Sequence, residues 1–320
     1  MSLLAVEDLA IRVPGGLAVD GVSFTLAPGE VLGLMGESGA GKSLTGAALL
    51  GLLPAGAALA GGRIQFDGAR LDLLAESGWR RLRGRRIGAV FQDPATALDP
   101  LQRVGAQLAE TLRYHGKPPS ARLDVVGAWL AAVGLPAERA RAYPHELSGG
   151  MRQRVAIALA LCPGPDVLVA DEPTTALDMP LRGQVAGLLR RLARAQRSSV
   201  LLISHDVRSV AAAADRVAVM YAGRLAEIGP AEQVLRAPAH PYTRALLASV
   251  PGLDARVDRL AATPGAMPPP GAVPPGCAFA PRCARADAAC LRRPPLVAGV
   301  ACWHAGGYET GPVTTCRGRT

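Results

Sequence analysis

Apolar residues along this chain are grouped in short runs that predict an α/β fold. The opening stretches LLAVEDLAIRV and VSFTLAPGEVLGLM are rich in β-forming residues and are interrupted at 14–16 and 28–29, which indicates a small antiparallel β region. From VLGLM (31–35) the pattern becomes strand, glycine-rich loop and helix, which is the start of an α/β unit. Two further buried strands are predicted at VLVAD (167–171) and VLLIS (200–204).

Helical periodicity dominates the middle of the chain. Residues from about 94 to 146 look helical, and their apolar positions fall on one face, as in Leu108, Leu112, Val126, Trp129, Leu130 and Val133. LRGQVAGLLRRLARAQ predicts a helix with an apolar stripe, and VAVMYAGRLAEIG (217–229) predicts a hairpin. The most apolar window, 43–60, contains Pro54 and follows a phosphate-loop motif, so we interpret it as a buried helix with its exit loop, not as a membrane span.

Charge and cysteine content narrow the class of protein. The net charge of +9 permits a nucleic-acid or anionic-membrane partner, but the densest basic run, 79–86, is short and lacks interleaved aromatic residues, so we expect no nucleic acid. The N-terminus MSLLAVED lacks the pattern of a signal peptide. We therefore expect a reducing, cytoplasmic location, which disfavours disulfides among the six cysteines.

Residues 36–43, GESGAGKS, match G-x-x-x-x-G-K-[ST] and lie between a predicted strand and a predicted helix. Glycines let successive backbone N–H groups turn toward phosphate oxygens, and the helix N-terminus adds the positive end of its dipole. Lys42 would bind the β- and γ-phosphates, while the hydroxyl of Ser43 can ligate Mg²⁺.

Two other stretches add to this nucleotide site. Asp171 and Glu172 end an apolar strand, where Asp171 would hold Mg²⁺ and Glu172 would polarise the water that attacks the γ-phosphate. LSGGMRQR (147–154) places Ser148-Gly149-Gly150 at a second helix start that can bind an anion. One nucleotide cannot use both helix starts of one chain, so we expect two chains, head to tail, each covering the other's ATP.

With these motifs the chain resembles the ATP-binding cassette (ABC) superfamily. Residues 36–43 match its Walker A motif, 167–172 its Walker B motif and 147–151 its signature loop. Gln92 matches the Q-loop, Ala176-Leu177-Asp178 the D-loop and His205 the switch histidine. Two departures are Met151, where a Gln is usual, and RVPGGLAV (12–19), which has no aromatic residue to stack on adenine.

The resemblance implies a P-loop NTPase cassette of α/β class, with a RecA-like core, an antiparallel β subdomain and a helical subdomain. It implies that Asp178 lies in the D-loop, that Gln92 contacts Mg²⁺ and a partner, and that His205 hydrogen-bonds the γ-phosphate during hydrolysis by Glu172. It also implies contacts with ATP from Gly36, Ser38, Gly39, Gly41, Lys42, Ser43, Leu44 and Gln92.

A closer resemblance is to the ATPase subunits of di- and oligopeptide ABC importers. It is carried by YPHELSGGMRQRVAIALAL, VFQDPATALDP, HPYTRALLASVP and GCAFAPRC. It implies two membrane permease subunits, a second ATPase chain (the same or a paralogue), indirect work with an extracytoplasmic substrate-binding protein, and a place at the cytoplasmic face of the membrane. A soluble ABC ATPase of DNA repair or translation, and an importer of glutathione or nickel, are the alternatives.

Four cysteines, Cys277, Cys283, Cys290 and Cys302, lie close together near the C-terminal end, separated by five, six and eleven residues. This spacing fits neither a common zinc ribbon nor a bacterial ferredoxin, so by itself it leaves zinc and iron open. The resemblance favours a [4Fe-4S] cluster, with zinc as the alternative. Cys162 is interpreted as a core residue and Cys316 as a free thiol.

The expected organisation is an ATPase domain at 1–235, with its helical subdomain at about 94–160, and a connecting helical segment at 236–263. Residues 264–320 are expected to form a proline-rich linker and a cysteine-rich metal-binding domain, which has too few large apolar residues to order itself without a metal. We expect the phosphate site to belong to a core that folds separately from this tail.

Overall fold

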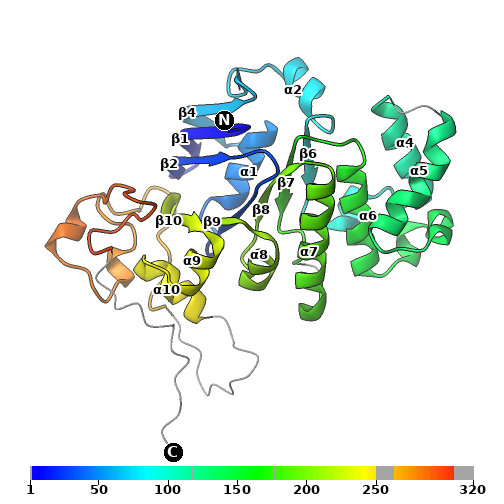
Figure 1. Cartoon of the computed structure of the whole chain (residues 1–320). Coiled ribbons are helices and arrows are strands. Elements are labelled where there is room, and N and C mark those ends of the chain that lie inside the picture. Colours follow the sequence, from blue (N-terminus) through cyan, green and yellow to red (C-terminus); the bar gives the residue numbers. More distant parts are fainter. Residues whose placement is uncertain (1, 117–118, 176, 250–262, 306–320) are drawn as a thin grey trace, which may run out of the picture.

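The computed structural model describes residues 2–116, 119–175, 177–249 and 263–305. Two sheets organise the chain: an antiparallel sheet in the order β2-β1-β4-β5 and a six-stranded sheet in the order β10-β9-β3-β8-β7-β6 (Figure 1). The strands are β1 Leu4–Val13, β2 Gly16–Leu26, β3 Val31–Met35, β4 Ala58–Phe66, β5 Ala69–Arg70, β6 Ile87–Val90, β7 Val167–Asp171, β8 Ser199–Ile203, β9 Arg216–Tyr221 and β10 Arg224–Pro230.

Five neighbouring strands of the larger sheet, from β9 to β6, are parallel, and β10 pairs antiparallel with β9. Alternate side chains of the central strands belong to two apolar clusters, one on each face of the sheet. Leu32, Val169 and Ile203 pack with α1 and the antiparallel sheet. Leu168 and Leu202 pack in a second cluster with α6 and α7. Both faces of the sheet are covered, which explains why these strands are continuous apolar runs in the sequence.

The helices are α1 Lys42–Leu50, α2 Glu76–Leu82, α3 Pro94–Ala97, α4 Val104–Tyr114, α5 Pro119–Ala132, α6 Gly149–Leu161, α7 Met179–Ala195, α8 Val207–Ala213, α9 Ala231–Arg236 and α10 Pro241–Ala248, with four 3₁₀ turns at Ala137–Arg141, Pro144–Glu146, Ala280–Arg282 and Ala288–Leu291. Helices α4, α5 and α6 share an apolar cluster of their own. The predicted inward face is confirmed, since Leu108, Leu112 and Leu130 are fully buried.

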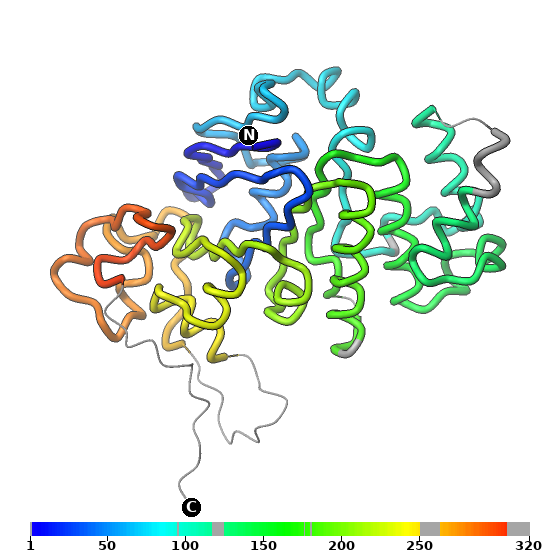
Figure 2. Tube along the Cα trace, viewed as in Figure 1, coloured from blue at the N-terminus to red at the C-terminus, as the bar shows by residue number. Residues whose placement is uncertain are grey.

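Residues 263–305, here called the C-terminal unit, lie against β10, α9 and α10 (Figure 2). The unit has two 3₁₀ turns, and a single β-bridge joins it to β10, between Glu227 and Val300. Phe279 inserts beside Tyr221 and Tyr242, with ring centroids 5.3 and 5.4 Å away. An aromatic cluster therefore attaches this irregular unit to the end of the large sheet.

The apolar window 43–60 is only partly the expected helix and loop. Helix α1 ends at Leu50, before Gly51 in a left-handed conformation (φ 62°), and a new strand, β4, already begins at Ala58. The first six residues of β4 are exposed and include two glycines, so neither an apolar run nor an alternation reveals the strand. None of the helices in the described residues combines the length and apolar character needed to cross a bilayer.

Candidate nucleotide-binding site

Four loops meet where parallel neighbouring strands end. The glycine-rich loop follows β3, Glu172 follows β7, His205 follows β8, and Gln92 follows β6. Because the carboxyl ends of parallel strands lie at one edge of a sheet, the topology gathers these loops into one region. The sequence predicted the residues, and the strand order explains how they meet.

The backbone of the glycine-rich loop requires two of its glycines. Gly36 has φ 151°, and a Cβ there would collide with the carbonyl oxygen of Met220. Gly41, the N-cap of α1, has φ 99°, and a Cβ would lie 2.7 Å from the carbonyl oxygen of Ala18. Both positions favour glycine for conformational and steric reasons. The loop therefore turns its backbone toward the start of α1, as phosphate binding requires.

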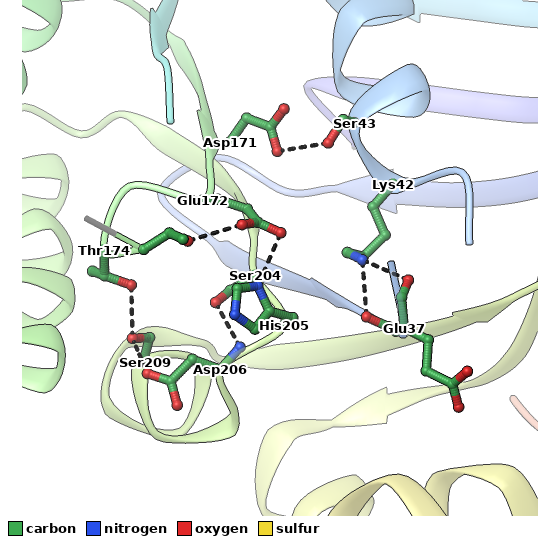
Figure 3. Close-up of polar contacts among 12 residues, drawn as sticks. Glu37, Lys42, Ser43, Asp171, Glu172, Thr174, Ser204, His205, Asp206 and Ser209 are labelled. Atoms are coloured by element: carbon green, nitrogen blue, oxygen red, sulfur yellow. Dashed lines mark hydrogen bonds and ion pairs between the residues drawn. The ribbon is translucent and has the colours of Figure 1, made fainter. Parts of the chain in front are cut away.

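Lys42 is the first residue of α1, and it is almost completely buried beneath the glycine-rich loop. Its Nζ donates hydrogen bonds to the carbonyl oxygens of Gly36 (2.8 Å) and Glu37 (2.9 Å), as Figure 3 shows. Burial lowers the pKa of Lys42, although the nearby carboxylates of Glu172 and Asp171 act in the opposite direction. The site thus holds a desolvated cation, which binds anionic oxygens strongly.

The two adjacent acids have different surroundings. Ser43 Oγ donates to Asp171 Oδ1 at 3.0 Å, and burial raises the pKa of Asp171 despite this bond. Burial would also raise the pKa of Glu172, but hydrogen bonds from His205 and Thr175 outweigh it and lower the pKa. The paired hydroxyl and carboxylate of Ser43 and Asp171 are hard oxygen ligands suited to Mg²⁺. Glu172 is kept as a carboxylate, the form a general base needs.

Glu172 is held by its backbone as well as by its side chain. Its φ of 47° is unusual for a residue with a Cβ, and its N–H donates to the carbonyl oxygen of Ile203 at 2.8 Å. Thr175 Oγ1 donates to Oε2 at 2.8 Å, and His205 Nδ1 lies 3.0 Å from Oε1. The carboxylate is therefore oriented from both sides.

A supporting network around His205 was not predicted from the sequence. The backbone N–H of Asp206 donates to Ser204 Oγ at 3.0 Å, and Asp206 caps α8 by accepting from the N–H of Arg208. Ser209 Oγ donates to Asp206 Oδ2 at 2.7 Å and lies 3.0 Å from Thr174 Oγ1 (Figure 3). This chain of contacts joins the loop after β7 to the loop after β8.

The signature residues occupy a different part of the chain's surface. Ser148 caps α6 by accepting from the N–H of Met151 at 3.3 Å, so the helix expected after the signature serine is present and begins at Gly149. Helix α6 packs on α3, α4, α7 and β6, whereas α1 packs on β2, β7 and β8. Gln92 and Asp178 are exposed. Ala176 of the predicted D-loop lies outside the described residues.

The glycine-rich loop is in direct contact with α10 and with the C-terminal unit, which the sequence did not indicate. Arg282 Nη1 forms an ion pair with Glu37 Oε2 at 3.0 Å, and the Arg282 side chain is only 6% exposed. Tyr242, from HPYT, is fully buried and accepts a hydrogen bond from the Glu37 N–H at 2.9 Å. Sequence reasoning used HPYT only as a family signature, although a buried tyrosine needs a polar partner. That partner is the glycine-rich loop.

The four clustered cysteines are all free thiols that face one another closely enough to interact electrostatically. Burial raises the pKa of Cys277, with smaller contributions from Cys290 and Cys302. Burial likewise raises the pKa of Cys302, with contributions from Cys283 and Cys290. Apart from these, burial raises the pKa of Cys162 to about 12, as expected for a core thiol. Cys316 lies outside the described residues.

A smaller group of possible ligands was missed from the sequence. The ligand atoms of Asp287, Cys290 and His304 lie within 4.8 Å of one another, and His304 Nε2 is 3.2 Å from Asp287 Oδ2. No three of the four thiols lie within 4.8 Å of one another in the described chain. Four thiolates around one zinc would be about 3.8 Å apart, given a Zn–S length of about 2.3 Å. A zinc ion held by all four thiols would require them to lie closer together than they do.

Comparison with known proteins supports the assignment of this site. Residues 19–175 match the ABC transporter family, and 226–290 match the oligopeptide/dipeptide transporter C-terminal region. A putative peptide import ATP-binding protein of Brucella abortus is 46% identical over 303 residues, covering 92% of this chain and 91% of the relative. The dipeptide transport ATP-binding protein DppD of Bacillus subtilis is 47% identical, covering 83% and 82%.

The oligopeptide transport ATP-binding protein OppD of Escherichia coli is 45% identical, with 92% of this chain and 89% of OppD covered. Among solved structures, the ATP-binding cassette MJ0796, a dimer with ADP and Pi, matches with a TM-score of 0.63 and 25% identity over 71% of this chain and 98% of its own. CbiO1 of Clostridium perfringens matches with a TM-score of 0.66 and 30% identity, covering 73% and 90%. The predicted fold class is confirmed, and the chain belongs to the ABC family as a relative of the oligopeptide and dipeptide transport ATP-binding proteins.

Proposed function

We propose that this protein hydrolyses ATP to drive the import of di- and oligopeptides through a membrane ABC permease. The observation that carries the proposal is 46% identity to a peptide import protein over 92% of the chain, including the C-terminal region. The charged site supports the same conclusion, since Lys42, Ser43, Asp171 and Glu172 occupy the positions that phosphate and metal binding require.

In the proposed reaction, backbone N–H groups of the glycine-rich loop and Lys42 bind the phosphates. Ser43 and Asp171 would hold Mg²⁺, which when bound would supply neutralisation of charge on the phosphate oxygens. Glu172 accepts the proton of the attacking water, while His205 and Thr175 keep its carboxylate oriented. His205 then hydrogen-bonds the γ-phosphate. These roles follow from the site geometry and the family resemblance.

Uptake by cells tests the cargo. Disrupting this chain should abolish uptake of labelled di- and tripeptides, and the intact chain should restore it, whereas the Glu172→Gln variant at equal abundance should not. Uptake of labelled glutathione and of ⁶³Ni²⁺ is measured in parallel. If disruption abolished the uptake of glutathione or of nickel but left peptide uptake unchanged, that compound, and not peptides, would be the cargo.

A hollow on the helical part of the chain is the proposed docking site for the permease. It has a volume of about 550 Å³. Tyr114, which is 80% exposed, lines the hollow. Leu101, which is 85% exposed, lies between Asp99 and Gln102, two lining residues. Phe91, before Gln92 in the chain, is a third exposed apolar side chain. Exposed apolar side chains at the rim of a hollow are typical of a protein interface.

We also propose that two ATPase chains form two composite sites. The signature helix packs on elements other than those that hold the phosphate loop, which is compatible with its serving a second chain. The dimer of MJ0796 with ADP and Pi supports this arrangement. A homodimer and a pair with a paralogue are both compatible with an intact Glu172, His205 and Ser148.

Mixing experiments test the composite sites. Ser148→Arg should abolish hydrolysis yet leave ATP binding to the same chain intact, whereas Lys42→Ala should abolish binding. A mixture of the two variants should recover up to one working site per dimer. Full hydrolysis by monomers of the native chain would contradict the proposal.

The four clustered thiols are proposed to bind a [4Fe-4S] cluster. Cys277, Cys283, Cys290 and Cys302 would supply the four thiolates, and no three of them in the described residues lie within 4.8 Å of one another, as one shared zinc ion would need. The cluster would act structurally, because the C-terminal unit contains few buried apolar side chains. Zinc at Asp287, Cys290 and His304 is the alternative.

Metal content tests this assignment. Protein purified without oxygen should be brown and contain about four irons per chain. Cys283→Ser should lose the iron, while Cys162→Ser, a matched change at a core thiol, should retain it. One zinc that is lost in both Cys290→Ser and His304→Ala but kept in Cys283→Ser would establish the alternative site. Metal-free protein with four alkylatable thiols would exclude both.

The cellular context follows from these assignments. We propose a peripheral location at the cytoplasmic face of the membrane, beneath the permease, with an extracytoplasmic substrate-binding protein delivering cargo from the other side. The division into 1–235, 236–263 and 264–320 also stays a proposal. Limited proteolysis with mass spectrometry would locate the boundaries.

A further inference from the structure

The direction of the bound nucleotide follows from the site itself. Asp171, Glu172 and His205 follow β7 and β8, so the γ-phosphate faces that side of the glycine-rich loop. The nucleoside must then leave on the opposite side, toward β9, β10 and the turn between β1 and β2. Strand β2, just after that turn, is close to the loop, because a Cβ on Gly41 would lie 2.7 Å from the carbonyl oxygen of Ala18. The turn between β9 and β10 is close as well, since the N–H of Gly223 donates to the carbonyl oxygen of Ala40 at 3.0 Å.

On this side of the site, the apolar surface comes from the C-terminal unit and not from an aromatic residue near the β1–β2 turn. Residues 12–19 contain no aromatic side chain on which a base could stack. The first part of the C-terminal unit, residues 263–271, lies there instead. Met267 Cε is 3.1 Å from the Cβ position of Gly39, and a Cβ on Gly16 would lie 2.5 Å from the N of Gly271. The segment therefore runs from the phosphate loop to the β1–β2 turn.

We infer that residues 267–270 supply the surface against which the adenine of ATP packs. The inference rests on the ATP site proposed above and extends it to the base. Met267, Pro268 and Pro270 are half-buried, so each retains accessible apolar surface. A thioether is polarizable and contacts aromatic rings favourably, and apolar walls are typical of ligand sites. The segment takes the place of a stacking aromatic residue.

Arg282 positions this segment relative to the phosphate loop. Its Nε donates to the carbonyl oxygen of Pro264 at 2.8 Å, and its Nη1 pairs with Glu37 at 3.0 Å. The guanidinium also lies 5.6 Å from the ring centroid of Tyr221. One buried arginine thus joins the start of the segment to the loop that holds the phosphates, which sets the distance between the base surface and the phosphate site. Arg282 is a positioning residue, since it acts through Pro264 and Glu37 and is not proposed to touch the base or the phosphates.

Binding of ATP is compared with binding of tripolyphosphate, which has the phosphates but no base. Both are titrated by calorimetry with Mg²⁺ into the native protein and into Met267→Ser, Met267→Leu and Val297→Ser. Met267→Ser should weaken ATP binding about tenfold, in line with the loss of one base contact, and leave tripolyphosphate binding unchanged. Met267→Leu should retain most of the affinity. Val297→Ser, an exposed apolar change in the same unit, should bind like the native protein.

Three results would overturn the inference. Equal weakening of both ligands would mean that Met267 only supports the phosphate loop, unchanged ATP binding would place the base elsewhere, and tighter ATP binding would mean that the segment obstructs the base. Failure of the native protein to bind either ligand would instead refute the ATP site itself. Arg282 provides a second measurement, in which Arg282→Gln should raise the KM for ATP several-fold with little change in kcat, and Arg282→Lys should partly restore it. A matched fall in kcat would contradict a positioning role.

Discussion

The large parallel sheet and the C-terminal unit are stabilised in different ways. All five residues of β8 are buried, and apolar clusters cover both faces of the sheet. Across residues 263–305, the buried apolar side chains are Ala278, Phe279 and Cys290. Burial of apolar area is the main driving force of folding, so the sheet has it in abundance and the C-terminal unit has little.

Polar contacts with the ATPase core compensate in part. Asp20 accepts from Arg224 at 2.8 Å and from Arg293 at 3.2 Å, while Arg224 also donates to the carbonyl oxygen of Gly276. Arg282 adds its contact with Glu37. A unit with so few buried apolar side chains depends on these contacts with its neighbour. We therefore expect that substitutions in the C-terminal unit, which is weakly packed, leave the large sheet folded.

The largest expected effect is on the rate of ATP hydrolysis, and it comes from the residue proposed as the general base. Glu172→Gln should lower the kcat of ATP hydrolysis by roughly 10²–10⁴-fold, the usual contribution of a general base, with ATP binding retained. Single-turnover hydrolysis and filter binding of ATP check both parts. Glu232→Gln, at an exposed carboxylate paired with Arg236, is the matched control and should hydrolyse ATP normally. Near-normal turnover in Glu172→Gln would assign the base to another residue.

One substitution made in both regions measures the difference in packing. Leu202→Ala, at a fully buried position of β8, should cost about 2–5 kcal/mol in the free energy of unfolding, because it removes apolar contacts and leaves a cavity. Leu296→Ala, at a position 42% exposed in the C-terminal unit, should change it by less than about 0.5 kcal/mol. Denaturant unfolding of both variants gives the values. Equal losses would mean that the two regions unfold as one.

Acid should weaken the packing at His240, whose ring centroid lies 6.1 Å from that of Phe279 in the C-terminal unit. Burial lowers the pKa of His240 to about 4, and its ordinary value is 6.5. The unfolded chain therefore binds a proton more readily, so the stability from neutral His240 is complete above pH 6.5 and is lost as the pH falls toward 4. The loss should reach about 3 kcal/mol. Chemical unfolding from pH 7 to pH 4 measures it.

A matched variant isolates this histidine. His240 Nδ1 accepts from the Tyr242 N–H at 3.0 Å and so caps α10. Asn can also cap a helix but does not titrate, so His240→Asn should flatten the pH dependence between 6.5 and 4. An unchanged slope in His240→Asn would assign the effect to other groups.

The smallest expected effect concerns the ion pairs between the regions. Asp20→Asn removes the acceptor shared by Arg224 and Arg293, and partly exposed pairs contribute about 1 kcal/mol or less. The C-terminal unit should become more sensitive to protease, while the core melts almost as before. Asp67→Asn, which removes the pair with Arg86 elsewhere on the surface, should leave the unit as resistant as in the native protein. Equal sensitivity in both variants would mean that Asp20 has no special role.

The sequence brought out the candidate residues of the nucleotide site, and the structure gathers them in one region. Lys42, Ser43, Asp171, Glu172 and His205 were identified before the structure, because phosphate loops and acidic strand ends have strict local requirements. The strands that carry them are buried on both faces and are therefore continuous apolar runs. By contrast, the exposed, glycine-containing β4 has no such pattern and was missed.

Contacts between distant segments could not be predicted in the same way. Nothing in HPYT indicates that Tyr242 accepts from Glu37, about two hundred residues earlier, and nothing near Cys283 indicates that Arg282 pairs with the same residue. Ion pairs and hydrogen bonds of this kind have no periodicity, since they depend only on which surfaces meet after folding.

By itself, the sequence determined the fold class, the strands of the core and the residues of the phosphate site, because burial period and backbone geometry act locally along the chain. The tertiary structure alone decided that the C-terminal unit reaches the glycine-rich loop and the turn between β1 and β2. It also decided that Glu37 joins Arg282 and Tyr242 there. The physical reason is that these contacts require close approach of segments whose own patterns are irregular, and only the packing of β10, α10 and residues 263–271 brings them within reach.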